Sequence, residues 1–200
     1  MLVHAIMPAS RANGPGLRCV VFVQGCNLDC PGCWNPRSHT FDGSDLAIGS
    51  ILAEVLHWRR QHALHGVTFS GGEPMQQADD LAELLQGLRS ALPTLSFGMF
   101  TGYSEKELKT GRYFTRHGVD RDQRRALWRS IRGQLDFAVM GRFNRLQPSD
   151  APMRTSANQA LRLFSDRYSE NDFGEQTVEI TIAPDGLTRT TGFPTLGNPA

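Results

Sequence analysis

The chain has 200 residues, of which 40% are hydrophobic and 20% are charged, and its formal net charge at pH 7 is +1. A chain of this length and composition is typical of one compact domain with a sizeable hydrophobic core. The near-neutral charge and the lack of a long apolar run predict no nucleic-acid partner and no membrane span.

Residues 1–16 have no basic segment ahead of a long apolar run, so we expect no secretory signal and a cytoplasmic location. In that reducing compartment, closely spaced cysteines indicate metal binding or catalysis rather than structural disulfides. We expect a single domain over 1–200, with a core at about 13–165 and a C-terminal extension at about 170–200.

Strands and helices are predicted to alternate along the chain. Residues 17–25 are crowded with apolar and β-branched side chains, as in a strand buried on both faces, and this strand stops at Gly25. A helix follows at 50–62, with Ser50 available as its N-cap, and then a short strand at 66–74 that ends in glycines. The same pattern continues with helices at 77–92 and 122–134 and strands at 95–103 and 135–143.

This alternation predicts an α/β fold in which helical crossovers connect parallel strands. Ligand sites in such folds lie at the carboxyl ends of the strands. After Pro148 the pattern changes, and residues 176–193 predict a β-hairpin. The evidence is the alternation of Val178, Ile180 and Ile182 ahead of a Pro184-Asp185-Gly186 turn.

Three of the four cysteines lie in "GCNLDCPGCWN" at 25–35, directly after the first predicted strand. Cys26, Cys30 and Cys33 have the spacing C-x3-C-x2-C, which allows three thiolates to meet at one inorganic centre. A structural zinc site usually has four ligands, so His39 would have to complete it. Cys19 lies in the predicted buried strand and is expected to be a core thiol.

Two further interpretations of these cysteines remain. A redox Cys-x-x-Cys pair uses Cys30 and Cys33 but leaves Cys26 without a role, and unrelated buried thiols leave the clustering unexplained. Ligand number and spacing therefore favour an iron-sulfur cluster over zinc, and zinc over unrelated thiols. Three protein ligands on four irons leave one iron open to another ligand.

The cysteine spacing resembles that of the radical S-adenosylmethionine (SAM) superfamily, in which the amino and carboxylate groups of SAM chelate the open iron. "SGGEP" at 70–74 is similar to the glycine-rich segment that meets the SAM amino group in that superfamily. Gly71 and Gly72 permit close backbone approach, and Glu73 provides negative charge for an ammonium group.

Within the superfamily, the chain resembles the activating enzymes of anaerobic ribonucleotide reductase. Met140 and Thr155 stand where that family often has aspartate and glycine. The segments that carry the resemblance, in order, are "NGPGLRC" at 13–19, "CPGCWN" at 30–35, "SGGEP" at 70–74, "TGY" at 101–103, "GRF" at 141–143 and "SANQ" at 156–159.

The resemblance implies an incomplete (β/α) barrel of radical SAM type, with the predicted hairpin as a C-terminal extension. It implies a [4Fe-4S] cluster on Cys26, Cys30 and Cys33, with SAM on the open iron. The SAM contacts implied by the resemblance are Gly32, Cys33, Trp34, Gly71, Gly72, Glu73 and Pro74.

The implied reaction is reductive cleavage of SAM to a 5′-deoxyadenosyl radical, which takes hydrogen from a glycine of a large reductase. The implied partners are that glycyl radical enzyme and an electron donor of the flavodoxin or ferredoxin type. A radical SAM enzyme that modifies a peptide or small metabolite is an alternative, as is a non-enzymatic metal or electron-carrier protein. "SGGEP" argues against the carrier, which needs no SAM pocket and normally has four cluster ligands.

Overall fold

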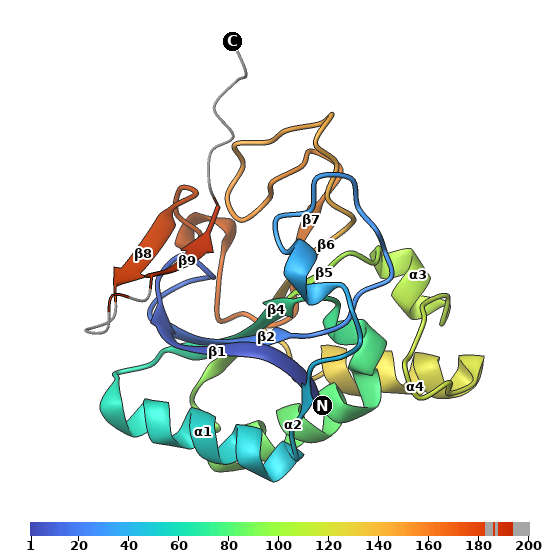
Figure 1. Ribbon diagram of the computed structural model, residues 1–200, viewed down its shortest axis with the longest axis horizontal. Coiled ribbons are helices and arrows are strands. Elements are labelled where there is room, and N and C mark those ends of the chain that lie inside the picture. The colour runs from blue at the N-terminus through green and yellow to red at the C-terminus, as the bar shows by residue number, and fades with distance from the viewer. Residues whose placement is uncertain (183–185, 187, 194–200) are drawn as a thin grey trace.

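The computed structural model describes residues 1–182, 186 and 188–193. Its centre is a seven-stranded sheet with the strand order β3-β1-β2-β4-β5-β6-β7, and β8 and β9 form a separate two-stranded sheet (Figure 1). The strands are β1 Leu2–Ser10, β2 Arg18–Val23, β3 Ser44–Asp45, β4 Gly66–Gly71, β5 Ser96–Thr101, β6 Phe137–Met140, β7 Ala160–Leu163, β8 Val178–Ile182 and β9 Thr188–Gly192. The α-helices are α1 Ile48–Gln61, α2 Ala78–Ala91, α3 Glu105–Lys109 and α4 Arg121–Arg132, and the 3-10 helices are η1 Pro36–Ser38, η2 Pro74–Gln77 and η3 Glu170–Asp172.

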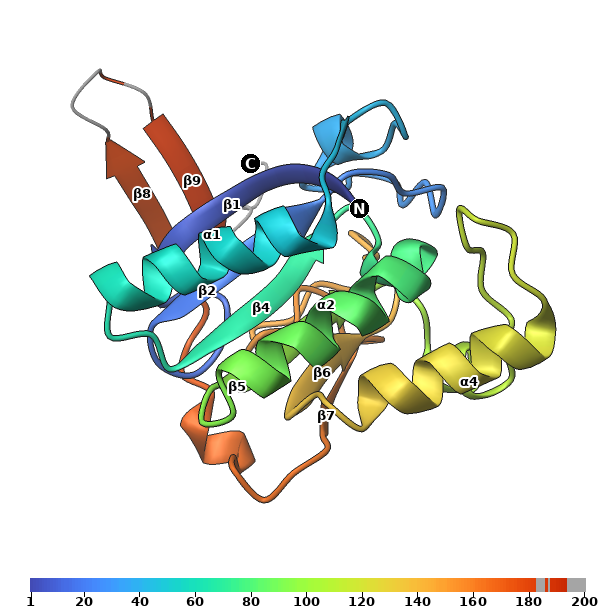
Figure 2. The same cartoon turned by 90° about the horizontal axis from the view of Figure 1, so that it is seen from below.

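The four central strands, β2, β4, β5 and β6, run parallel to one another, which confirms the predicted α/β fold. Helices α1, α2 and α4 lie beside one another across one face of the sheet (Figure 2). On the two sides of the parallel strands, β1 pairs antiparallel with β2 and β7 pairs antiparallel with β6, and neither was predicted. β1 lies between β2 and β3 with an irregular burial pattern, and β7 has one neighbouring strand and is only partly buried. Neither sequence therefore carries a clear period-2 pattern.

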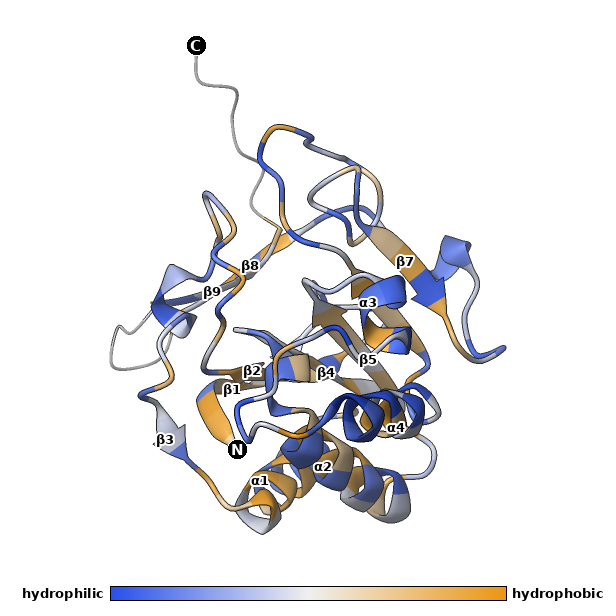
Figure 3. Ribbon diagram, turned by 90° about the vertical axis from the view of Figure 1, so that its right-hand side faces the viewer, coloured by the Kyte–Doolittle hydropathy of each residue, from blue (hydrophilic) through white to orange (hydrophobic). Residues whose placement is uncertain are grey.

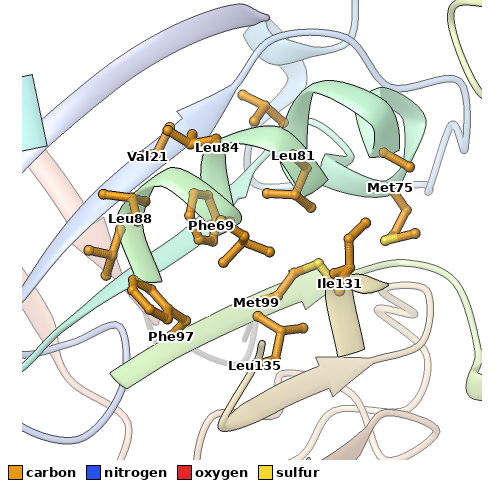
Figure 4. Packing of buried hydrophobic residues seen from close by; sticks show 14 of the residues in the cluster. Val21, Phe69, Met75, Leu81, Leu84, Leu88, Phe97, Met99, Ile131 and Leu135 are labelled. Carbon is orange, nitrogen blue, oxygen red and sulfur yellow. The ribbon is translucent and has the colours of Figure 1, made fainter. Parts of the chain in front are cut away.

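The face of the sheet that meets the helices carries the main hydrophobic core. Leu81, Leu84 and Leu88 of α2 pack with Phe69 and Phe97 of the neighbouring strands (Figure 4). Apolar residues accordingly concentrate in the central strands and in α1 and α2, whereas α3 is largely hydrophilic (Figure 3). No helix in the described part of the chain is both long enough and apolar enough to span a membrane.

Two predictions about single residues have clear outcomes in this core. Cys19 is fully buried in the core cluster, as predicted, and burial raises the pKa of its thiol to about 12. Ser50 is not an N-cap, so that prediction was wrong: α1 already begins at Ile48, after Ala47. The first residue of the helix, Ile48, is partly buried and packs against the core.

Side chains alternate along a strand, so the parallel strands present a second set of residues to the opposite face. At the amino-terminal ends of the strands, the buried guanidinium of Arg18 occupies this face. Its Nε donates to Thr68 Oγ1 at 2.6 Å, its Nη1 donates to Ser96 Oγ at 2.8 Å, and it lies 5.0 Å from the ring centroid of Phe137. Arg18 therefore fills this face of the sheet at the amino-terminal ends of the strands and holds β2, β4 and β5 together through hydrogen bonds.

Replacement of Arg18 by methionine is expected to lower the free energy of unfolding by about 3 kcal/mol, because several buried acceptors lose their donor. Urea denaturation of the two proteins measures the difference. The matched control is Arg60→Met, since Arg60 is exposed on α1. Equal stability of the Arg18 variant and wild type would contradict a structural role for this guanidinium.

Candidate active site

A cavity of about 330 Å³ lies at the carboxyl ends of the parallel strands, on the face away from the helices. Side chains of the second set, including Phe22, Ser70, Phe100 and Val139, line it. The loops that follow the strands form the rest of the wall. This is the position expected for a ligand site in a fold with parallel strands.

The cavity brings together most of the residues singled out in the sequence. Of the predicted site residues, seven line it: Cys26, Cys30, Cys33, Trp34, Gly71, Gly72 and Glu73. Gly32 and Pro74 are not among its lining residues. Gly32 provides the turn between two cysteines with a φ of +77°, and Pro74 is buried as the first residue of η2.

The cysteine loop is fastened to the "SGGEP" segment through the backbone. Gly72 N donates to Val23 O at 2.8 Å, and Glu73 N donates to Gly25 O at 2.9 Å. A Cβ on Gly72 would lie 2.5 Å from Gly25 O, and Gly71 has a φ of +100°. The two glycines therefore allow the two chain segments to lie against each other, in addition to lining the cavity.

Glu73 is buried and connects two loops of the site. Its Oε1 accepts from Met75 N at 2.9 Å and from Thr101 Oγ1 at 2.7 Å, and its Oε2 accepts from Gly102 N at 2.7 Å. Burial raises the pKa of Glu73 to about 7, although the three donors act in the opposite direction. The carboxyl group thus holds the loop after β5 in place and also faces the cavity.

This raised pKa predicts a pH-dependent stability. The folded pKa of about 7 lies above the ordinary value of 4.5, so the stabilisation from Glu73 is complete below pH 4.5 and is lost as the pH rises through 7. A Glu73→Gln variant cannot ionise at this position, so it should not lose this stabilisation. As the pH rises from 4.5 to 7, the free energy of unfolding of the variant should increase by about 3 kcal/mol relative to that of wild type. Urea denaturation at several pH values tests this, and parallel pH profiles would contradict it.

Two thiols of the cysteine loop, those of Cys26 and Cys30, lack the lowered pKa of a reactive redox cysteine. Burial raises the pKa of Cys26 to about 12 and also raises the pKa of Cys30, so both free thiols are protonated at neutral pH. Redox-active cysteines have lowered pKa values and are largely thiolates. The two cysteines instead need a metal centre to release their protons.

The spacing of the sulfur atoms also disfavours zinc. Within the described residues, only Asp79, Asp80 and His117 bring three potential ligand atoms within 4.8 Å of one another. The sulfur atoms of Cys26, Cys30 and Cys33 are therefore more widely spaced than that. Sulfurs on a single zinc ion lie about 3.8 Å apart, given Zn–S bonds of about 2.3 Å. His39 lies outside the cavity wall and contributes its backbone carbonyl, which accepts from Cys26 N at 2.9 Å. The wider thiol triplet is better suited to a cluster of several irons.

Trp34 forms an aromatic wall with residues from distant parts of the chain. Its ring centroid lies 5.6 Å from that of Phe143 and 6.4 Å from that of Phe193. Its indole Nε1 is buried, and it has no hydrogen-bond partner among the residues that the structure describes. A buried donor without a partner beside a cavity indicates a ligand with an acceptor atom.

Arg142 and Asn158 of the "GRF" and "SANQ" motifs support the cavity wall rather than line it. Arg142 forms a bidentate pair with Glu107, with Nη2 to Oε1 at 2.9 Å and Nη1 to Oε2 at 3.0 Å. Asn158 Nδ2 donates to Arg142 O at 2.9 Å, and Gln159 Nε2 donates to Gly141 O at 3.1 Å. "GRF" and "SANQ" are thus held together, and of these residues only Gly141, Phe143 and Gln159 line the cavity.

Some lining residues were not predicted as site residues. Asn13 lies in a quoted motif but had no assigned role, and Thr190, Thr191, Gly192 and Phe193 belong to the C-terminal hairpin. No local pattern identifies them, because the hairpin reaches the cavity only through tertiary contacts.

Comparison with known proteins agrees with this geometry. Residues 12–162 match the family model described as a 4Fe-4S single cluster domain. An anaerobic ribonucleoside-triphosphate reductase-activating protein of Vibrio cholerae is 30% identical over 172 residues, which cover 82% of this chain and 99% of the relative. The chain belongs to the radical SAM family of activating enzymes.

Other relatives of this radical SAM activating enzyme carry similar names. The anaerobic ribonucleoside-triphosphate reductase-activating protein of Escherichia coli K12 is 30% identical over 112 residues, covering 54% of this chain and 73% of the relative. The pyruvate formate-lyase-activating enzyme of Clostridium pasteurianum is 35% identical over 111 residues, covering 52% of this chain and 46% of the relative. Membership in this family makes a [4Fe-4S] cluster and SAM the cofactors of the enzyme.

Proposed function

We propose that this radical SAM enzyme installs a glycyl radical on an anaerobic ribonucleotide reductase, with Cys26, Cys30 and Cys33 as the ligands of its cluster. One observation carries the proposal: the three thiols and the Gly71–Glu73 segment line the same cavity at the carboxyl ends of the parallel strands. The names of the relatives support the choice of protein substrate.

The side chains and backbone of the cavity fit these cofactors. The cysteine triplet leaves one iron open for SAM. Trp34 Nε1, which has no hydrogen-bond partner among the described residues, offers a donor to a polar ligand. When bound, the reduced cluster and SAM supply an electron and a carbon-centred radical that can take hydrogen from an unactivated carbon.

The protein itself positions and shields these groups. The backbone bonds from Gly72 and Glu73 hold the cysteine loop against the strand end where SAM is proposed to bind. Trp34, Phe100, Phe143 and Phe193 reduce access of water to the cavity. The Glu73 carboxylate contributes negative charge toward the amino group of SAM.

Three further proposals follow from the family. The parallel strands, with helices on one face and the cavity on the other, support an incomplete (β/α) barrel of radical SAM type. A flavodoxin or ferredoxin-type protein is the proposed electron donor. The four cysteines are all free, which supports the reducing cytoplasm as the proposed location.

The decisive experiment is anaerobic reconstitution of the enzyme with iron and sulfide, followed by addition of dithionite, SAM and the reductase. We expect 5′-deoxyadenosine and the electron paramagnetic resonance doublet of a glycyl radical. A reductase variant in which the target glycine is alanine serves as the control. Cleavage of SAM without a doublet would favour a peptide or small-metabolite substrate, and no cleavage would refute the radical SAM mechanism.

A further inference from the structure

The β8–β9 hairpin lies outside residues 12–162, which match the family model, yet it forms part of the cavity wall. In Figure 1 it stands on the side of the sheet away from α1 and α2. Glu179 of β8 anchors the hairpin to the end of β1: its carboxylate accepts hydrogen bonds from Ser10 Oγ and from Arg11 N, the latter at 2.8 Å. Asn13 Nδ2 also donates to Thr191 Oγ1 at 2.9 Å. One face of the hairpin is therefore fixed to the body of the protein.

The last residues of β9 bring the hairpin to the site. Phe193 N donates to Thr177 O at 2.8 Å, which keeps the two strands together at their base. The Phe193 ring is 7% exposed and lies 5.9 Å from the ring of Phe100, centroid to centroid. A Cβ on Gly192 would lie 2.1 Å from Thr177 O, so only glycine fits there. The base of the hairpin is a packed part of the cavity wall.

The other face of the hairpin carries an exposed apolar stripe. Val178, Ile180 and Ile182 are 40%, 64% and 71% exposed, and they are three of the six large hydrophobic residues exposed in the described part of the chain. Such a concentration on one short strand is unusual for a surface without a partner. The side chains of Glu179 and Thr181 alternate with them and lie on the opposite face.

The register of the hairpin connects this stripe to the cavity. Val178 is paired with Gly192 and Ile180 with Thr190, and paired residues of an antiparallel ladder share one face. Gly192 and Thr190 both line the cavity, as does Thr191 between them, which is paired with Glu179 on the opposite face. The stripe thus continues outward from the cavity wall. Among the described strands, β8 pairs only with β9, so its outer edge is also available.

We propose that the stripe of Val178, Ile180 and Ile182 is a docking surface for an extended, apolar segment of the protein substrate, which it directs into the cavity. This inference rests on the proposed function, because radical transfer to a glycine of another protein requires a stretch of its backbone to enter the site. An apolar face beside a free strand edge suits an extended segment, which can pair its backbone and bury alternate side chains. Continuity with the cavity favours the substrate protein over a second copy of this chain.

The test is an Ile180→Glu/Ile182→Glu double variant of the reconstituted holoenzyme. The anaerobic ribonucleoside-triphosphate reductase of the same organism, labelled with a fluorophore, is the probe, and anisotropy gives the Kd. We expect a Kd at least about tenfold weaker than wild type, because two exposed anchors are replaced by charges. Dithionite-driven SAM cleavage without reductase should stay unchanged, since neither residue lines the cavity.

Thr181→Glu is the control, because it adds a glutamate to the same strand on the opposite face, one negative charge where the double variant adds two, and it should bind like wild type. Equal Kd values for all three proteins, equal weakening by both variants, or loss of basal SAM cleavage in the double variant would overturn the docking surface. A wild-type dimer that the double variant dissolves would assign the stripe to a second copy and also overturn it. A wild-type enzyme that cleaves SAM but forms no glycyl doublet would instead refute the proposed function.

Discussion

Replacement of Cys26, Cys30 or Cys33 by alanine is expected to abolish cluster binding and SAM cleavage. Each thiol lines the cavity, and loss of one would leave two protein ligands for a cluster that already has an open iron. The measurements are iron and sulfide content after anaerobic reconstitution, the absorbance of the cluster, and 5′-deoxyadenosine formed with dithionite. Iron content tests the ligands independently of activity.

Cys19→Ala is the matched control for these variants. Cys19 is fully buried on the helix side of the sheet, so its replacement should leave both the cluster and SAM cleavage intact. Full iron content and SAM cleavage in any one of the three loop variants would refute that residue as a ligand. Loss of the cluster in the Cys19 variant would show that the fourth thiol had been wrongly assigned to the core.

Gly72→Ala is expected to lower SAM cleavage by about a hundredfold or more. The new Cβ would lie 2.5 Å from Gly25 O, which is the acceptor for Glu73 N. Either the cysteine loop or the Glu73 segment must then move, and small displacements of positioning groups have large kinetic effects. SAM binding to the holoenzyme and the yield of 5′-deoxyadenosine measure the change.

The variant should still take up iron, because the three cysteines belong to one short loop and Gly72 is not a ligand. Circular dichroism and iron content therefore separate a misplaced loop from an unfolded protein. Gly49→Ala is the control, since a Cβ at Gly49 on α1 meets nothing within 4 Å. Wild-type SAM cleavage by the Gly72 variant would show that this close approach is not required.

The predicted elements were most accurate where the pattern is local. The strand at 17–25 and the helix at 77–92 were confirmed as β2 and α2, because runs of β-branched residues and a 3.6-residue period are properties of neighbouring residues. The hairpin was confirmed as well, and Gly186 of the predicted turn has a positive φ of +83°. Pro184 and Asp185 of that turn lie outside the described residues.

The site could be predicted only in part. The cysteine loop and Gly71–Glu73 were expected together, since loops after parallel strands gather at one end of a sheet. The roles of individual residues were less predictable. Glu73 was expected to meet the amino group of SAM, and the structure shows that its oxygens also accept from Thr101 and Gly102, which lie after a different strand.

The sequence by itself determined the order of strands and helices, the cysteine spacing and the family landmarks, because these are written in residue types and short intervals along the chain. Only the tertiary structure decided that β1, β3 and β7 complete the sheet, that Arg18 fills the face opposite the helices at the amino-terminal ends of the parallel strands, and that Phe193 reaches the cavity. Those features depend on strand register and on contacts between residues far apart in sequence, which no local pattern encodes.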